Sequence, residues 1–90
     1  MDIKVANNAS AKRFETMVDG SMAVLDYELE DGTLILVHTG VPPALEGRGI
    51  GGKVVKAALE YAQDAGLKVV PECPFVRSYI ERHKEYEHLL

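Results

Sequence analysis

From position 45 the sequence reads Leu45-Glu46-Gly47-Arg48-Gly49-Ile50-Gly51-Gly52-Lys53, with four glycines in six positions. Glycines allow backbone conformations in which successive N–H groups converge on one point, and a helix that starts there adds the positive end of its dipole. This turn is therefore typical of a site for phosphate or pyrophosphate. The alternative is a tight turn, primed by Pro42-Pro43, in which the glycines only reverse the chain.

A helix is predicted directly after the glycine turn. Apolar residues recur at helical spacing from about 49 to 65, and Gly66 follows as the expected C-terminal cap. A short strand at 67–70 comes next. A second helix is predicted from about 74 to 83, with a proline at its first position and Cys73 as its N-cap or the neighbour of the N-cap.

The sequence before the glycine turn predicts an antiparallel meander. Two Asp-Gly pairs are strong signals for tight hairpin turns, because both central residues of such turns need a positive φ. Strands are predicted between and around these pairs, at 13–18, 22–30 and 33–41, with a weaker strand at 3–6.

The strand predicted at 33–41 is apolar on both faces. Simple alternation places Leu34, Leu36 and His38 on one side, and Ile35, Val37, Thr39 and Val41 on the other. This pattern is typical of a central strand that is covered on both sides.

The order of these elements defines the fold class. A strand followed by a helix and another strand implies parallel pairing through a right-handed crossover. We therefore predict an α/β protein with a mixed sheet, in which an antiparallel meander is followed by one βαβ unit and a C-terminal helix. The length of 90 residues fits one domain spanning residues 1–90.

Composition limits the expected partners. Ten basic against 14 acidic residues give a net charge of −4, so nucleic acid is not an expected partner. The one cysteine can form neither an internal disulfide nor a Cys-rich zinc site, and no metal is expected. Without an apparent signal peptide or membrane span, the sequence predicts a cytoplasmic protein with no membrane contact.

Two phosphate motifs compete for the glycine turn. Gly47, Gly49 and Gly52 fit the dinucleotide pattern G-x-G-x-x-G, and Glu72 lies about 20 residues on, where a ribose-binding acid is expected. That pattern belongs to a repeated parallel sheet, whereas the strands predicted upstream are antiparallel. A P-loop needs a hydroxyl residue after its lysine, where Val54 stands.

The turn also resembles the acetyl-CoA pyrophosphate loop of GNAT-type N-acetyltransferases, written Q/R-x-x-G-x-G/A. Gly49 and Gly51 match this pattern, while Glu46 stands where Gln or Arg is usual. Further motifs resemble a small branch of single-domain GNAT-like proteins and extend the resemblance over most of the chain: His38-Thr39-x-Val41-Pro42, Gly47-x-Gly49-Ile50-Gly51, Pro71-x-Cys73-Pro74-Phe75-Val76 and Tyr79-Ile80-Glu81-Arg82-His83.

The resemblance implies a minimal GNAT fold that uses acetyl-CoA or CoA as a co-substrate. In this family the pantetheine arm lies in a gap between two splayed parallel strands, here 34–41 and 67–72, and bonds to exposed backbone groups. The implied cofactor-binding residues are Thr39, Val41, Gly47, Arg48, Gly49, Ile50, Gly51, Gly52 and Lys53. Arg48 and Lys53 would neutralise the pyrophosphate, or only solvate the start of the helix.

Two residues are candidates for catalysis. Cys73, at a helix start that favours a thiolate, would face the thioester and accept the acetyl group or handle its proton; the alternative is a small buried apolar residue. His38 would act as a base toward the amine or Cys73, or is a packed core residue. Tyr79 lies one position from the tyrosine that many GNAT enzymes use as an acid, so packing is expected of it. His83 and the residues after it are expected to be a solvated tail.

The leading hypothesis is an enzyme that transfers an acetyl group from acetyl-CoA to an amine of unknown identity, either a small molecule or a protein. The alternative is a CoA-binding or sensing module of the same fold without transfer. A third possibility is an interaction domain whose acidic strand face, with Asp26, Glu28 and Glu30, meets a basic partner. The short segments between the first strands leave the acceptor side open, to be closed by a large substrate, a second copy or a protein partner.

Overall fold

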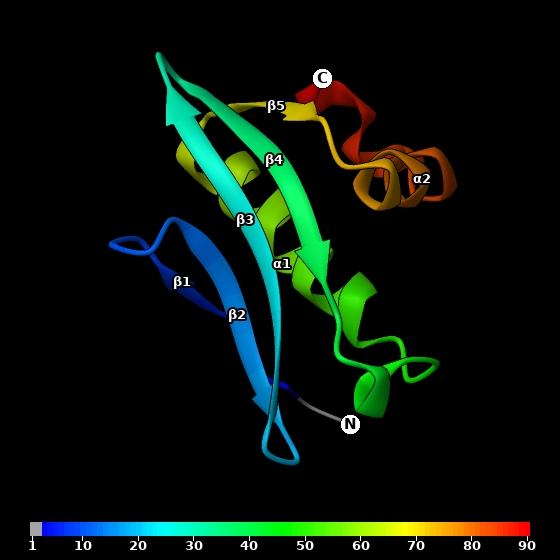
Figure 1. Ribbon diagram of the computed structural model, residues 1–90. Coiled ribbons are helices and arrows are strands. Elements are labelled where there is room, and N and C mark those ends of the chain that lie inside the picture. The colour runs from blue at the N-terminus through cyan, green and yellow to red at the C-terminus, as the bar shows by residue number, and fades with distance from the viewer. Residues whose placement is uncertain (1–2) are drawn as a thin grey trace.

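The computed structural model describes residues 3–90, which form one mixed sheet with helices (Figure 1). The five strands lie side by side in the order in which they occur in the sequence. In chain order the elements are β1 (Ala6–Asn8), β2 (Arg13–Val18), β3 (Ser21–Glu30), β4 (Thr33–Gly40), the 3-10 helix η1 (Pro43–Leu45), α1 (Ile50–Ala65), β5 (Lys68–Pro71), α2 (Pro74–Arg82) and the 3-10 helix η2 (Lys84–Leu89). The predicted α/β fold with a mixed sheet is confirmed.

The predicted antiparallel meander is also confirmed. At both hairpins the Asp and the Gly of the turn have a positive φ, 50° and 79° at Asp19-Gly20 and 47° and 78° at Asp31-Gly32. These values are those that a two-residue type I′ turn requires. The weak first strand lies later than predicted, at Ala6–Asn8, where it pairs with the start of β2. Ile3 and Val5 precede it and pack against the core.

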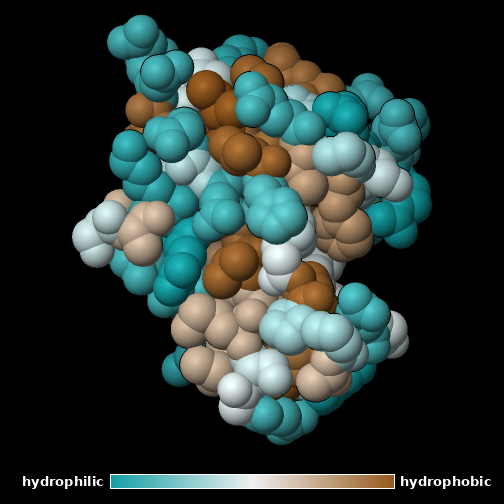
Figure 2. Space-filling model, viewed as in Figure 1, coloured by the Kyte–Doolittle hydropathy of each residue, from teal (hydrophilic) through white to brown (hydrophobic). Residues whose placement is uncertain are grey.

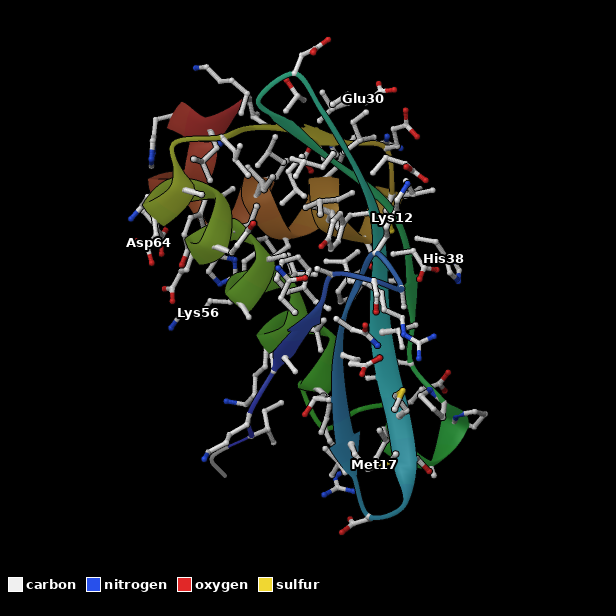
Figure 3. The ribbon with its side chains drawn as sticks, turned by 90° about the vertical axis from the view of Figure 1, so that its left-hand side faces the viewer. Lys12, Met17, Glu30, His38, Lys56 and Asp64 are labelled. Atoms are coloured by element: carbon white, nitrogen blue, oxygen red, sulfur yellow. The ribbon has the colours of Figure 1, made fainter. Side chains whose placement is uncertain are left out.

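The prediction that the 33–41 strand is covered on both sides is wrong. The helices lie on one face of the sheet, and Figure 3 shows Lys12 and His38 on the opposite side from α1. Val37 on that open face is 41% exposed. Figure 2, which views this face, shows polar and apolar residues side by side. The core therefore occupies one side of the sheet, where α1 packs against inward residues of the strands: Phe14, Val18, Ala23, Leu25, Tyr27, Leu34 and Leu36.

A β-bulge changes the facing of β4. Tyr27 pairs with Leu36, but the preceding Asp26 pairs with His38, so Val37 is an extra residue in β4. Because side chains alternate between faces, one extra residue reverses the facing of every residue after it. His38 is therefore exposed on the open face, and Thr39 takes the inward position that simple alternation gave to His38.

The crossover is the βαβ unit that the sequence predicted. α1 ends at Ala65, and Gly66 caps it with φ 71°, its N–H bonding to carbonyl oxygens in the last turn. β5 then pairs in parallel with β4, from Thr33–Lys68 to Leu36–Pro71. α2 follows, with Cys73 as its N-cap and a proline in its first turn.

The C-terminal segment is not the solvated tail that was predicted. It forms η2, in which Tyr86 and Leu89 are buried against the helices. The Tyr86 hydroxyl donates a hydrogen bond of 3.1 Å to Oε2 of Glu60 on α1. This contact fixes the C-terminal segment on α1 and helps to hold α2 in place.

Tyr86→Phe should lower the free energy of unfolding by about 1 kcal/mol, because it removes a partly buried hydrogen bond. Burial and the nearby Glu60 and Glu85 carboxylates raise the pKa of Tyr86 to about 12, above the value of about 10 for an unfolded tyrosine. A raised folded pKa means that this stability is fully present below about pH 10 and is lost as the pH rises toward 12.

Urea unfolding of wild type and variant across this pH range measures the effect. The gap in unfolding free energy should be constant up to about pH 10 and then narrow. A gap that does not change with pH up to 12 would contradict the role given to the Tyr86 hydroxyl.

Candidate active site

A pocket of about 390 Å³ lies where the end of β4, the glycine turn and the start of α2 meet. These three segments face one another on the right of Figure 1. The pocket is lined by backbone and apolar side chains for the most part: Thr39, Val41, Leu45, Glu46, Gly47, Gly49, Ile50, Gly51, Gly52 and Phe75.

The two parallel strands separate beside this pocket. Their pairing ends at Leu36 and Pro71, and the N–H of Cys73 still bonds to the Leu36 carbonyl at 3.0 Å. Beyond Leu36, β4 continues to Gly40, and in the part of the chain that the structure describes β3 is the only strand that pairs with this last segment. Backbone groups on the other edge of Val37–Gly40 are thus available to a ligand, as the predicted gap requires.

The glycine turn places free N–H groups at the pocket. Gly47 and Gly49 have φ values of 77° and 74°, a left-handed conformation that other residues rarely adopt, and Gly49 is the N-cap of α1. No side chain caps α1, and its first turn contains no acidic residue. The first N–H groups of a helix have no partner within it, so the turn can bind an anion through its backbone.

Most of the predicted cofactor residues line the pocket, but the two cations do not. Thr39, Val41, Gly47, Gly49, Ile50, Gly51 and Gly52 all contribute to its wall. Lys53 lies outside the lining. Arg48 is also outside, and its Nη1 forms an ion pair with Oδ2 of Asp19 at 2.9 Å. The structure therefore shows the pocket with backbone amides and no basic side chain in its wall.

Sequence reasoning missed Phe75 as a pocket residue. Phe75 is 41% exposed, and its ring packs over Gly51 in the first turn of α1. A Cβ atom placed on Gly51 would lie 3.1 Å from Cζ of Phe75 and 3.2 Å from Cγ2 of Val41. Gly51 thus leaves room for two side chains to close over it. The signal available in the sequence was an aromatic residue two positions after the candidate Cys73.

Cys73 lies just behind the pocket wall. Cys73 is 5% exposed, and its Sγ is 3.4 Å from Oγ1 of Thr39, a residue that does line the pocket. Burial raises the pKa of the Cys73 thiol, but the Thr39 hydroxyl and the backbone amides of Val76 and Phe75 outweigh it, so the pKa lies below its usual value. The Cys73 side chain makes no capping hydrogen bond, so these amides act mainly on the charged thiolate.

Thr39→Val should raise the pKa of Cys73 toward its ordinary value. The substitution keeps the shape of the side chain but removes the hydroxyl that favours the thiolate. Because the wild-type pKa is lowered, thiolate absorbance should appear at a lower pH in wild type than in the variant. An ultraviolet pH titration measures this, since the chain has one cysteine and Cys73→Ser supplies the baseline. Thr33→Val, on the same strand but away from the sulfur, is the control. Equal thiolate titration midpoints for wild type, Thr39→Val and Thr33→Val would contradict this role for Thr39.

The structure does not bring His38 to Cys73. After the bulge His38 is exposed and faces away from the helices, as Figure 3 shows. It cannot accept a proton directly from a thiol on the other side of the sheet. A role of His38 as a base toward an amine stays a prediction.

Tyr79 is largely buried on α2. Its ring stacks on that of His83, with centroids 3.9 Å apart, and the His83 Nδ1 lies 2.8 Å from the Tyr79 carbonyl oxygen. The ring also lies beside Gly52, where an added Cβ would be 3.5 Å from it. Tyr79 therefore packs the second half of α2 against the start of α1.

Residues 3–90 bring no three His, Cys, Asp or Glu side chains together in a way that could hold a metal ion. Among the helices of that same segment, none has both the length and the apolar character to cross a membrane.

The parallel pair β4–β5 at one edge of the sheet separates beside a glycine turn that can bind phosphate, as the resemblance to the N-acetyltransferases predicted, and comparison with known proteins agrees. A family model for the GCN5-related N-acetyltransferases matches residues 13–89. The chain therefore belongs to the GCN5-related N-acetyltransferase family, abbreviated GNAT, and is an acyltransferase by fold and family.

Individual relatives align over nearly the whole chain. Protein NATD1 of Xenopus tropicalis is 31% identical, over 97% of this chain and 83% of that protein. Protein NATD1 of Homo sapiens is 31% identical, over 97% of this chain and 80% of its own length. The NMR solution structure of a GCN5-like protein from Staphylococcus aureus superposes with a TM-score of 0.73 at 27% identity, covering 98% of this chain and 85% of that one.

Proposed function

We propose that this protein binds acetyl-CoA and transfers its acetyl group to an amine. The observation that carries the proposal is the continuity of one pocket, from the free amides at the start of α1, past the unpaired edge of β4, to the Thr39 hydroxyl and the Cys73 sulfur behind it.

The pyrophosphate of CoA fits the glycine turn. Its charge is compatible with the free N–H groups and the positive dipole end of α1, a helix of 16 residues. The pantetheine arm would then follow the β4 edge, bonding to the backbone near Thr39 and Val41. In this proposed arrangement the thioester would lie at the inner end of the pocket, close to Phe75 and Cys73.

Acetyl transfer requires three events at the thioester. The lone pair of a neutral amine attacks the carbonyl carbon, the bond from that carbon to sulfur breaks, and the amine loses a proton while the CoA thiolate gains one. Cys73 can serve in either of two ways. Its thiolate attacks the carbonyl first and passes the acetyl group on to the amine, or its thiol and the Thr39 hydroxyl deliver the proton to the departing CoA.

The acceptor is proposed to approach an open side of the molecule. The strands before β4 are joined by short turns, and in the described residues no helix covers the sheet face that carries His38. Such a surface does not enclose a small substrate by itself. We therefore propose that the amine belongs to a large substrate, or that a second copy or another protein completes the acceptor site.

Calorimetric titration with acetyl-CoA and CoA tests the proposal, followed by an assay of CoA release with a panel of amines. Binding that raises the melting temperature, together with amine-dependent release, is the expected result. No heat and no thermal shift at saturating acetyl-CoA would refute it. Binding without release by any amine, in wild type and Cys73→Ala alike, would identify the alternative, a CoA-binding module without transfer.

A further inference from the structure

The charge of the pocket wall is unfavourable for its proposed ligand. Among the residues that line the pocket, the one charged side chain is the carboxylate of Glu46. The pyrophosphate of CoA is an anion, and backbone amides supply only partial positive charge. A full positive charge close to the turn would therefore strengthen binding.

Arg48 can supply this positive charge, but its guanidinium forms an ion pair with a carboxylate from another part of the fold. Its guanidinium contacts Asp19, which lies in the turn between β2 and β3, 29 positions earlier in the chain. The side chains of Arg48 and Asp19 are 34% and 73% exposed. Ion pairs this exposed are weak and exchange readily with other partners.

We propose that Asp19 competes with the CoA pyrophosphate for Arg48 and thereby weakens cofactor binding. The inference rests on the proposed function and adds a regulating contact to the same site. When CoA binds, the guanidinium turns from the Asp19 carboxylate to the phosphate oxygens, to which it can donate two parallel hydrogen bonds. Asp19 thus sets CoA affinity from outside the pocket, and the β2–β3 hairpin is coupled to the cofactor loop.

Asp19→Asn is the test, because it removes the charge and keeps the turn. Asp19 has a φ of 50°, in the left-handed region where asparagine is as well accommodated as aspartate, and Gly20 follows it. The chain offers a matched control in Asp31→Asn, at the other Asp-Gly turn, with φ 47° and the same change of net charge.

Asp19→Asn should lower the Kd for CoA by up to about fivefold, the range that an exposed ion pair supports. Asp31→Asn should leave the Kd unchanged. In an Arg48→Ala background, Asp19→Asn should have no effect, because the residue that it releases is absent. The gain should persist with 3′-dephospho-CoA, which keeps the pyrophosphate.

Four results would overturn the proposal: equal affinities for wild type and Asp19→Asn, weaker binding by Asp19→Asn, an equal gain from Asp31→Asn, or a gain that is lost with dephospho-CoA. Any of them, with wild type still binding CoA, leaves the proposed function intact. If neither wild type nor any variant binds CoA, both the proposed function and the proposed role of Asp19 are refuted.

Discussion

Cys73→Ala is expected to lower the rate of acetyl transfer about a hundredfold or more while leaving the Kd for CoA nearly unchanged. Removal of a group that acts on a proton or attacks the substrate typically costs about 10²–10⁴-fold. Cys73 touches Thr39 at the inner end of the pocket and contributes nothing to the pocket wall at the glycine turn. Steady-state rates of CoA release with a reactive amine measure the first effect, and calorimetry measures the second.

Two further measurements separate the roles open to Cys73. Incubation of wild type with acetyl-CoA and no amine, followed by mass spectrometry, should show one added acetyl group on Cys73 if the thiolate is the nucleophile. If no adduct forms, the pH dependence of the transfer rate is compared between wild type and Cys73→Ala. A pH dependence that is present in wild type and lost in Cys73→Ala would identify a role in proton transfer. Cys73→Ser, which keeps a small polar side chain at the N-cap, shows whether packing is disturbed. Full activity in a folded Cys73→Ala protein would remove the residue from the mechanism.

The second large effect is expected from Gly51→Val, which should abolish detectable CoA binding. A Cβ at this position already lies within 3.3 Å of Phe75 and Val41 atoms, and the two valine methyl groups add to that crowding. Forcing extra carbon atoms into a packed site destabilises the folded protein by about 1–3 kcal/mol, so Phe75 and Val41 must move from the positions in which they line the pocket. The side chain also fills space in front of the amides that are proposed to hold the pyrophosphate.

Gly51→Ala and Gly52→Ala form a matched pair for this prediction. Both glycines lie in the first turn of α1, but a Cβ on Gly52 meets Tyr79 at an ordinary 3.5 Å. Alanine should therefore stabilise the free protein at position 52, because alanine favours helices over glycine, and should destabilise it at position 51. Urea unfolding distinguishes the two. If the Gly51→Val protein folds and binds CoA with wild-type affinity, CoA does not bind in this pocket.

Elements set by neighbouring residues were predicted well. The helix over 50–65 has a regular apolar face and a glycine at its end, and both turns between β2, β3 and β4 carry Asp-Gly. Most of the predicted cofactor residues line one pocket for the same reason, since the glycine turn and the end of β4 adjoin in the sequence.

Features that depend on distant residues were not predicted. The bulge at Val37 follows from how β4 pairs with β3, and periodicity along one strand does not reveal it; His38 and Thr39 were therefore assigned to the wrong faces. The ion pair between Arg48 and Asp19 and the packing of Tyr86 on α1 likewise join segments far apart in the chain. Arg48 was identified as a candidate residue without its partner Asp19, whereas Tyr86 was assigned to a solvated tail.

The strand order described above also bears on how the chain folds. Each strand pairs only with the strands next to it in the sequence, three pairings are antiparallel across short turns, and the one parallel pairing spans a single helix. Few long loops must close before native contacts form, so little conformational entropy of the chain is lost before each stabilising contact. Domains with such local pairing fold faster than sandwiches and barrels of equal size. The chain is thus expected to fold quickly, with β5 joining the sheet once α1 has formed.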